Sequence, residues 1–136
     1  MNNTNEYGLL IMRLSLGIVI IAHSLYLKLM VFTLEGTADY FSSIGLPAMF
    51  AYVVFIVEVV TGFMLLVGFK TKIAVLAVIP ILLGATWVHL SNGWLFSAPG
   101  GGWEYPLFLT AIAVVVLLTK NDSYSLDVRL QRTGQI

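Results

Sequence analysis

The sequence predicts an all-α membrane protein, built as a bundle of four transmembrane helices, and three observations lead to this. First, 59% of the 136 residues are hydrophobic and only 10% are charged, whereas a soluble domain carries about 25% charged residues. Second, the apolar residues gather in four long segments separated by stretches that contain Gly or Pro. Third, these segments lack the alternation of period two that marks a β-barrel strand, so helices are the expected way to satisfy the backbone in lipid.

The four segments have or approach the length of about 20 apolar residues that a bilayer core requires. Gly45 and Pro47 mark the start of the second helix, and Gly68 marks its end. The first helix could also continue to about residue 34, and residues 37–44 could form a short helix on the outer surface. We expect helices at about 8–27, 47–69, 73–90 and 104–119, outer loops at 28–46 and 91–103, and a cytoplasmic tail at 120–136, all within a single domain of residues 1–136.

The distribution of Lys and Arg sets the expected orientation. The loop between the third and fourth helices has no Lys or Arg, and the loop between the first and second has only Lys28. Because basic residues remain on the cytoplasmic side, both termini are expected there. The basic residues of the other loop and of the tail are Lys70, Lys72, Lys120, Arg129 and Arg132.

The composition excludes several classes of function. There are no cysteines, so this chain cannot supply a disulfide, a reactive thiol or the ligands of an iron–sulfur cluster. The formal net charge is zero, which argues against nucleic acid as a partner. No haem motif or nucleotide-binding loop is present, so no intrinsic haem or flavin site is expected. The expected surroundings are the lipid bilayer.

Two charged residues lie within the predicted spans, where ionisable groups mark functional sites by default. Arg13 is on the first helix and Glu58 is near the middle of the second. If the helices are antiparallel, their axial separation is on the order of 9 Å, which a long Arg side chain can largely bridge. Gly17 and Gly62 would let the two helices approach closely. We therefore predict an Arg13–Glu58 charge pair, either purely structural or involved in proton handling or ligand binding. A protonated Glu58 with another partner is the alternative.

A second polar set is expected towards the outer face, with His23, His89 and Glu104 contributed by three different helices. Two imidazoles and a carboxylate suit a quinone head group or a proton relay. A metal site is the weaker alternative, because no local metal-ligand spacing is present, and we predict none. The simplest alternative is two interfacial histidines and a glutamate that starts a helix. Trp87 and Trp103 could wall the pocket or belong to the interfacial aromatic belt.

Short motifs follow one another in a fixed order over nearly the whole chain: Arg13-Leu-Ser-Leu-Gly17 leading to His23, Gly45-Leu-Pro47, Glu58-Val-Val-Thr-Gly62 followed by Gly68, His89, Asn92-Gly93-Trp94, Gly102-Trp-Glu-Tyr-Pro106 and Tyr124-Ser-Leu-Asp127. In this order and at these spacings they resemble the DoxX family of small four-helix bacterial membrane proteins. At the end of the first helix the family usually has His-Gly followed closely by Lys-Leu; here Ser24 replaces the glycine and Lys28 comes one position later.

The resemblance implies a multi-pass protein of the bacterial inner membrane with redox-associated or accessory work, as the family is linked to thiosulfate:quinone oxidoreductase subunits. The resemblance fixes no cofactor: electron transfer would need either a quinone bound by this chain or a cofactor held by a partner subunit. Three hypotheses follow. The chain binds a quinone-like or other small hydrophobic ligand near the outer face, serves as a non-catalytic assembly subunit of a larger complex or homo-oligomer, or provides a proton or solute pathway through Glu58. Whether it is an enzyme stays open.

Overall fold

The computed structural model describes residues 3–134, and within them all the regular secondary structure is helical, without β-strands. A π-helical segment, η1, continues α1 without a break. The elements in chain order are α1 (Asn3–Ile21), η1 (Ala22–Val31), α2 (Leu34–Ser43), α3 (Met49–Val67), α4 (Thr71–His89), the short 3-10 helix η2 (Leu90–Asn92), α5 (Glu104–Leu118) and α6 (Leu126–Arg132).

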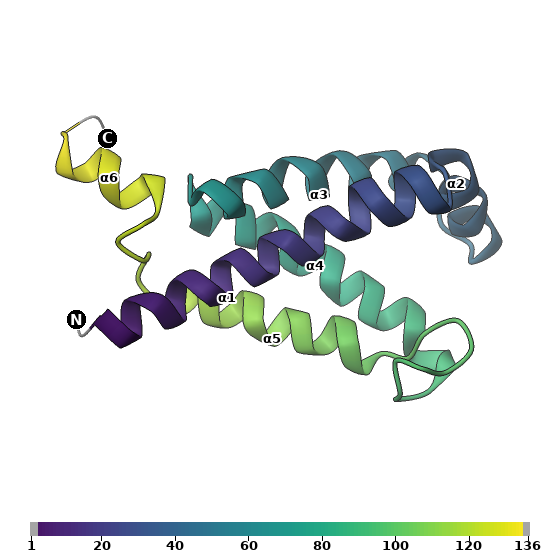
Figure 1. Cartoon of the computed structure of the whole chain (residues 1–136). Coiled ribbons are helices and arrows are strands. Elements are labelled where there is room, and N and C mark those ends of the chain that lie inside the picture. The colour runs from purple at the N-terminus through teal and green to yellow at the C-terminus, as the bar shows by residue number, and fades with distance from the viewer. Residues whose placement is uncertain (1–2, 135–136) are drawn as a thin grey trace.

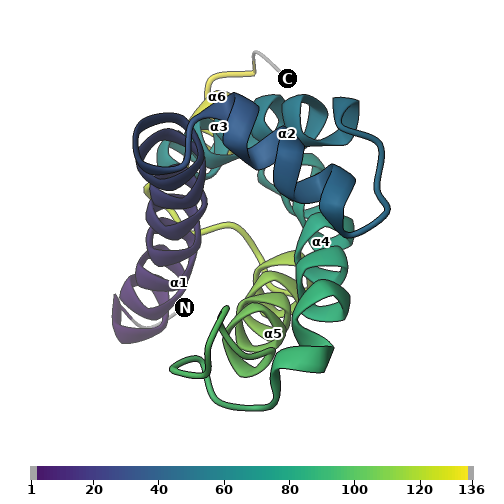
Figure 2. The same cartoon turned by 90° about the vertical axis from the view of Figure 1, so that its right-hand side faces the viewer.

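Four helices form the bundle in the order α1, α3, α4, α5, as the turned view in Figure 2 shows. The closest packing joins α4 to α5 and α1 to α3, whereas α1 and α5 touch over a smaller area. The start of α1 lies at the same end of the molecule as α6 (Figure 1). We call this the tail end. The opposite end, where α2 lies against α3 and η1, is the α2 end.

The core of the bundle is formed by apolar side chains from α1, α3, α4 and α5, among them Leu16, Leu65, Val75 and Val78. Many large apolar residues face outward instead, such as Ile56 at 59% exposure. The helical stretches Asn3–Val31, Met49–Val67 and Thr71–Asn92 are long and apolar enough to cross a membrane, and α5 is a shorter apolar helix. Outward apolar surface on such helices is the arrangement expected for contact with lipid.

Two glycines bring α1 and α3 together and fix their relative height. A Cβ atom at Gly17 would lie 3.1 Å from the Leu65 Cβ, and one at Gly62 would lie 2.7 Å from the Ile21 side chain. The prediction that these glycines allow close approach is therefore confirmed. They place residues 17 and 21 of α1 opposite residues 65 and 62 of α3.

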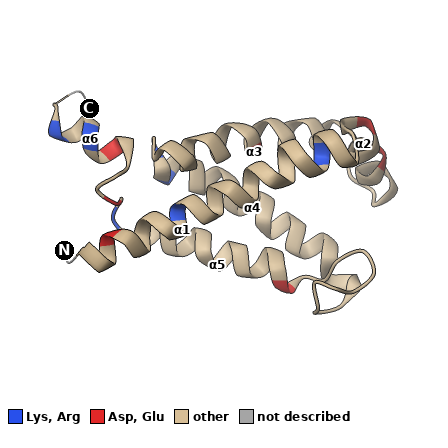
Figure 3. Ribbon diagram, viewed as in Figure 1, with Lys and Arg blue, Asp and Glu red and all other residues tan. Residues whose placement is uncertain are grey.

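All four predicted helices are present, and two regions expected as loop or tail contain further helix. The first helix continues as η1 to Val31, so Lys28 lies within it and not in an outer loop. The expected surface helix is present as α2. The tail contains α6, which begins at Leu126 because Ser125 caps it, its Oγ accepting from the Val128 N–H at 3.4 Å. Most of the charged residues lie towards the two ends of the bundle (Figure 3).

Candidate functional site

A buried ion pair joins η1 to α3 in the half of the bundle nearer the α2 end. The Nζ of Lys28 lies 2.7 Å from Oε1 and 2.6 Å from Oε2 of Glu58. The side chain of Glu58 is 5% exposed and that of Lys28 is 18% exposed. The carboxylate is thus enclosed by the bundle, whereas the ammonium group retains an opening to the surroundings.

The π-helical winding of η1 positions the lysine of this pair. The backbone N–H of Phe32 donates to the carbonyl of Leu27, five residues earlier, at 2.8 Å. Ser24 is fully buried and donates to the carbonyl of Ile20 at 3.0 Å. Because a π-helical turn holds more residues than an α-helical turn, it can accommodate one additional residue, and such segments are frequent at functional sites. The winding directs Lys28 towards α3, although it stands one position later than the resemblance leads one to expect.

The predicted Arg13–Glu58 pair is wrong, because the register of α1 and α3 keeps the two residues apart. Gly62 lies opposite Ile21, so Glu58, one turn earlier in the antiparallel α3, is level with the region of residue 25. That level is roughly 18 Å along the helix axis from Arg13. An Arg side chain cannot bridge this separation, and each residue has another partner.

Arg13 instead binds the segment that follows α5. Its Nε lies 2.7 Å from Oδ2 of Asp122, and its Nη2 lies 3.1 Å from Oδ1. Its Nη1 donates to the carbonyls of Leu65 at 2.5 Å and Leu66 at 2.9 Å, at the C-terminal end of α3. Both charged side chains are almost completely buried. Arg13 therefore links three elements of the bundle at the tail end and places its positive charge at the C-terminal carbonyls of α3, where the helix dipole favours it.

Two further charged residues cap helices at the tail end. Asp127 accepts from the backbone N–H of Lys70 at 2.6 Å and of Thr71 at 3.0 Å, and so caps the start of α4. Lys72 donates to the carbonyls of Val116, Leu117 and Thr119, and so caps the end of α5. Each charge has the sign that the helix dipole favours at that end. These contacts give the tail end a structural role in holding the helix ends together.

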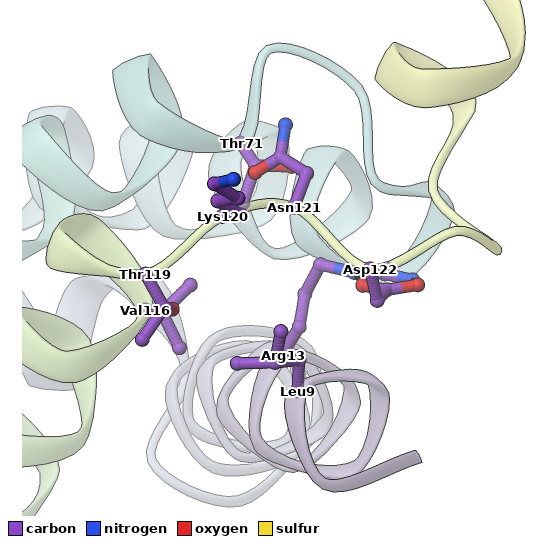
Figure 4. A pocket seen from close by; sticks show the side chains of 8 residues that line it. All are labelled: Leu9, Arg13, Thr71, Val116, Thr119, Lys120, Asn121 and Asp122. Atoms are coloured by element: carbon purple, nitrogen blue, oxygen red, sulfur yellow. Dashed lines mark hydrogen bonds and ion pairs between the residues drawn. The ribbon is translucent and has the colours of Figure 1, made fainter. Parts of the chain in front are cut away.

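A small cavity of about 10 Å³ lies beside the Arg13–Asp122 pair (Figure 4). The Thr71 hydroxyl next to it is buried, and among residues 3–134 it has no hydrogen-bond partner. A space of this volume is about what one water molecule requires. The cavity is therefore too small for an organic ligand and suits a single bound water.

His23 precedes Lys28 by five residues on η1, about one turn of a π-helix, so the two residues lie on neighbouring turns of the same segment. Its Nδ1 is 2.9 Å from the carbonyl of Val19, which places the proton of the neutral ring on Nδ1. Among the described residues no hydrogen bond involves its Nε2. The ring of Tyr105, from the first turn of α5, stacks on the imidazole with centroids 6.0 Å apart. The structure thus gathers His23, Lys28, Glu58 and Tyr105 from three helices, and we call this group the polar cluster.

The other residues of the predicted outer pocket have separate surroundings. The Nδ1 of His89 is 2.7 Å from the Ala85 carbonyl, and Glu104 accepts from the Phe96 N–H at 2.8 Å. Trp87 is 61% exposed, and Trp103 packs edge-on against Trp94 with centroids 4.4 Å apart. Within residues 3–134 no three His, Cys, Asp or Glu side chains are grouped as metal ligands. The weaker alternative of a metal site formed by His23, His89 and Glu104 thus has no geometric support.

Sequence reasoning assigned no pairing role to Lys28, Asp122 or Asp127. A signal existed for two of them, since a lysine after the histidine and a Ser-Leu-Asp stretch near the C-terminus both belong to the resemblance. Asp122 carried no such signal, because the polar composition of the tail does not indicate that this segment packs against the bundle.

The sequence of this chain is similar to that of known proteins. The model of the DoxX family matches residues 8–90, which include Arg13, His23, Lys28 and Glu58. A protein of Bacillus subtilis (strain 168) named "Putative oxidoreductase CatD" is 34% identical over 128 residues, covering 93% of this chain and 90% of that protein. No solved structure is significantly similar. The family model and the Bacillus relative together cover the helices that form the polar cluster. The chain therefore belongs to the DoxX family of membrane proteins.

Proposed function

We propose that this chain is a redox-associated subunit that binds a quinone-type head group at the polar cluster. The observation that carries the proposal is a buried Lys28–Glu58 pair on a π-helical segment, beside an imidazole whose Nε2 has no partner among the described residues. A charged pair inside the apolar part of a membrane bundle is expensive to maintain, and such groups are usually kept for function. The name of the Bacillus relative, which includes the word oxidoreductase, supports a redox role.

The chemistry of the polar cluster suits both forms of a quinone. An ammonium group has three N–H donors, and two of those on Lys28 point to Glu58, so one remains for a quinone carbonyl. His23 presents Nε2 as an acceptor, which suits the hydroxyl of a quinol. The exposed edge of Tyr105 adds an aromatic surface for the ring. A bound quinone would supply the two-electron chemistry that the side chains of this chain lack.

We further propose four membrane spans in the bacterial inner membrane, with both termini in the cytoplasm. The start of α1 and the helix α6 lie at one end of the molecule, which supports an even number of spans (Figure 1). The basic residues that predicted the orientation lie at this same end. They stand where α3 passes into α4 and in the tail that follows α5. The polar cluster then lies towards the outer side. The electron donor or acceptor would be a partner subunit in the membrane or a second copy of this chain.

The test is a binding titration of the purified protein in lipid nanodiscs, with decylubiquinone and 2-methylnaphthoquinone as probes. Quenching of tryptophan fluorescence reports binding. Loss of one hydrogen bond and the stacked ring in His23→Ala should weaken binding about fivefold to tenfold. His89→Ala is the matched control, because its ring makes the same contact to a carbonyl four residues earlier but lies outside the polar cluster.

The proposal would be contradicted if the quenching of tryptophan fluorescence in the parent protein did not saturate with added quinone. Equal effects of the two histidine variants would contradict it too. A stoichiometric partner recovered from native membranes without quinone binding would instead indicate an assembly subunit. Proton or solute flux that is lost in Glu58→Gln would indicate a pathway.

A further inference from the structure

An open groove of about 450 Å³ lies at the tail end, between the start of α1 and the segment that follows α5. This volume lies within the range of about 300–1,000 Å³ that is typical of small-molecule sites. The groove occurs where the bundle closes least tightly, between α1 and α5. Its lining residues are Thr4, Asn5, Gly8, Leu9, Met12, Thr119 and Lys120.

The lining of the groove is amphipathic along α1. Thr4 and Asn5 lie in the first described turn of α1, where the helix dipole favours negative charge, and Leu9 and Met12 follow one and two turns further into the bundle. Gly8 leaves an opening between them, since a Cβ atom at this position would meet nothing within 4 Å. A polar rim followed by an apolar wall matches a molecule with a polar head and an apolar chain.

Lys120 is the only charged residue among those that line the groove. It is exposed, and within residues 3–134 it forms no ion pair or hydrogen bond through its side chain. Neither Glu6 nor Asp122 pairs with it: Glu6 keeps its charge and accepts from the N–H and hydroxyl of Ser123 at 2.7 and 2.5 Å, and Asp122 pairs with Arg13. Lys120 is therefore available to an anion from outside the chain.

From this geometry we propose that the groove binds one anionic phospholipid. Lys120 pairs with the phosphate, Thr4 or Asn5 donates a hydrogen bond to it, and an acyl chain runs past Gly8 along Leu9 and Met12. Basic pockets between transmembrane helices at the membrane surface bind anionic lipid head groups in this way. The groove lies at the other end of the bundle from α2, so this site is separate from the polar cluster and does not depend on quinone binding.

Delipidated protein in detergent is titrated with dioleoylphosphatidylglycerol, dioleoylphosphatidylcholine or inorganic phosphate, and native mass spectrometry counts the bound lipid. Phosphatidylglycerol should bind more tightly than phosphatidylcholine, and inorganic phosphate should not displace it. Lys120→Gln should weaken phosphatidylglycerol binding about fivefold, the factor expected for one lysine at an anionic lipid surface. Arg132→Gln, an exposed charge on α6 outside the groove, should leave binding unchanged.

A second pair of variants tests the acyl-chain path without changing charge. Gly8→Leu fills the groove and should abolish tight binding, whereas Gly84→Leu, an equally open glycine on α4, should not. Both replace a helical glycine by a better helix former, so both should fold. Equal effects within either pair of variants, no preference for phosphatidylglycerol, or full competition by inorganic phosphate would overturn the proposal.

Discussion

Lys28 and Glu58 form a two-contact ion pair in which both carboxylate oxygens lie within 2.7 Å of the same ammonium nitrogen. Their burial is unequal, because the glutamate side chain is 5% exposed and the lysine side chain is 18% exposed. The lysine is therefore the partner that can reach polar surroundings if the pair is broken, whereas the glutamate has no such route.

This asymmetry predicts unequal effects of single substitutions. Lys28→Met leaves the buried Glu58 carboxylate without a counter-ion and should lower the free energy of unfolding by about 3–5 kcal/mol. Glu58→Gln should cost less, because the flexible lysine can extend towards the surface. The double variant Lys28→Met/Glu58→Leu should recover most of the loss, since replacing a buried pair by apolar groups is often close to neutral. Unfolding in mixed micelles with increasing dodecyl sulfate gives the four free energies; additive effects of the two single changes would contradict the pairing.

The Arg13–Asp122 pair predicts that the tail is held by one buried carboxylate. Asp122→Asn leaves the guanidinium group buried without its counter-charge and with at most one of its two side-chain contacts, and should lower the free energy of unfolding by about 3 kcal/mol. The released segment should become sensitive to protease after residue 119. Arg13→Lys should give a similar loss, because an ammonium group cannot reproduce the two parallel contacts to Asp122.

The matched control for this experiment is Asp39→Asn, which removes an exposed carboxylate on α2. Stability and cleavage should then remain as in the parent protein. If Asp122→Asn is cleaved no faster than Asp39→Asn, the tail is retained by other contacts and the assigned role is wrong.

The two contacts from Asp127 to the start of α4 predict a local effect. Asp127→Ala removes the acceptor for the N–H groups of Lys70 and Thr71 and should cost about 1–2 kcal/mol, as for other lost helix caps. Hydrogen exchange should accelerate in the first turn of α4. Ser125→Ala should instead accelerate exchange in α6, which Ser125 caps. Faster exchange in the same peptides for both variants would show that the two caps are not separable.

Features that are local in the sequence were predictable, whereas features that depend on how the helices pack were not. The helices were predictable because a run of apolar residues and the flanking Gly or Pro are local in the sequence. The partners of Arg13 and Glu58 were not, because they depend on the relative height of α1 and α3. Gly17 and Gly62 were recognised as contact points but not as opposite Leu65 and Ile21, which would have given the register. The π-helical winding of η1 also left no periodic signal.

The two histidines illustrate the same limit. His23 and His89 are alike in the sequence, each towards the C-terminal end of an apolar helical stretch, and each bonds a carbonyl four residues earlier. Only His23 lies beside a buried charge pair, because η1 turns Lys28 towards Glu58. The tail was unpredictable for a further reason. Asp122 and Asp127 stand in a short polar segment whose composition suits a solvated tail, and only packing against α1 and α4 gives them partners.

Gly68 predicts the most sensitive backbone position at the tail end. It ends α3 in the left-handed conformation, with φ of 71°, and its carbonyl accepts from the Asp127 N–H at 2.9 Å. A Cβ atom there would lie 2.7 Å from the Cα of Ser125, so the tail backbone would have to move. Gly68→Ala therefore combines a conformational penalty with a steric one and should cost about 2–5 kcal/mol.

Gly45 separates these two contributions. Its φ is 82°, close to that of Gly68, but a Cβ atom there would meet nothing within 4 Å. Gly45→Ala should therefore cost only the conformational penalty of about 1–2 kcal/mol. The difference between the two variants, measured by unfolding in the same micelles, isolates the contact between Gly68 and the tail. Protease sensitivity after residue 119 should rise in Gly68→Ala alone, because only that side chain displaces Ser125; equal losses of stability with an uncleaved tail would mean that the tail does not pack against α3 at this point.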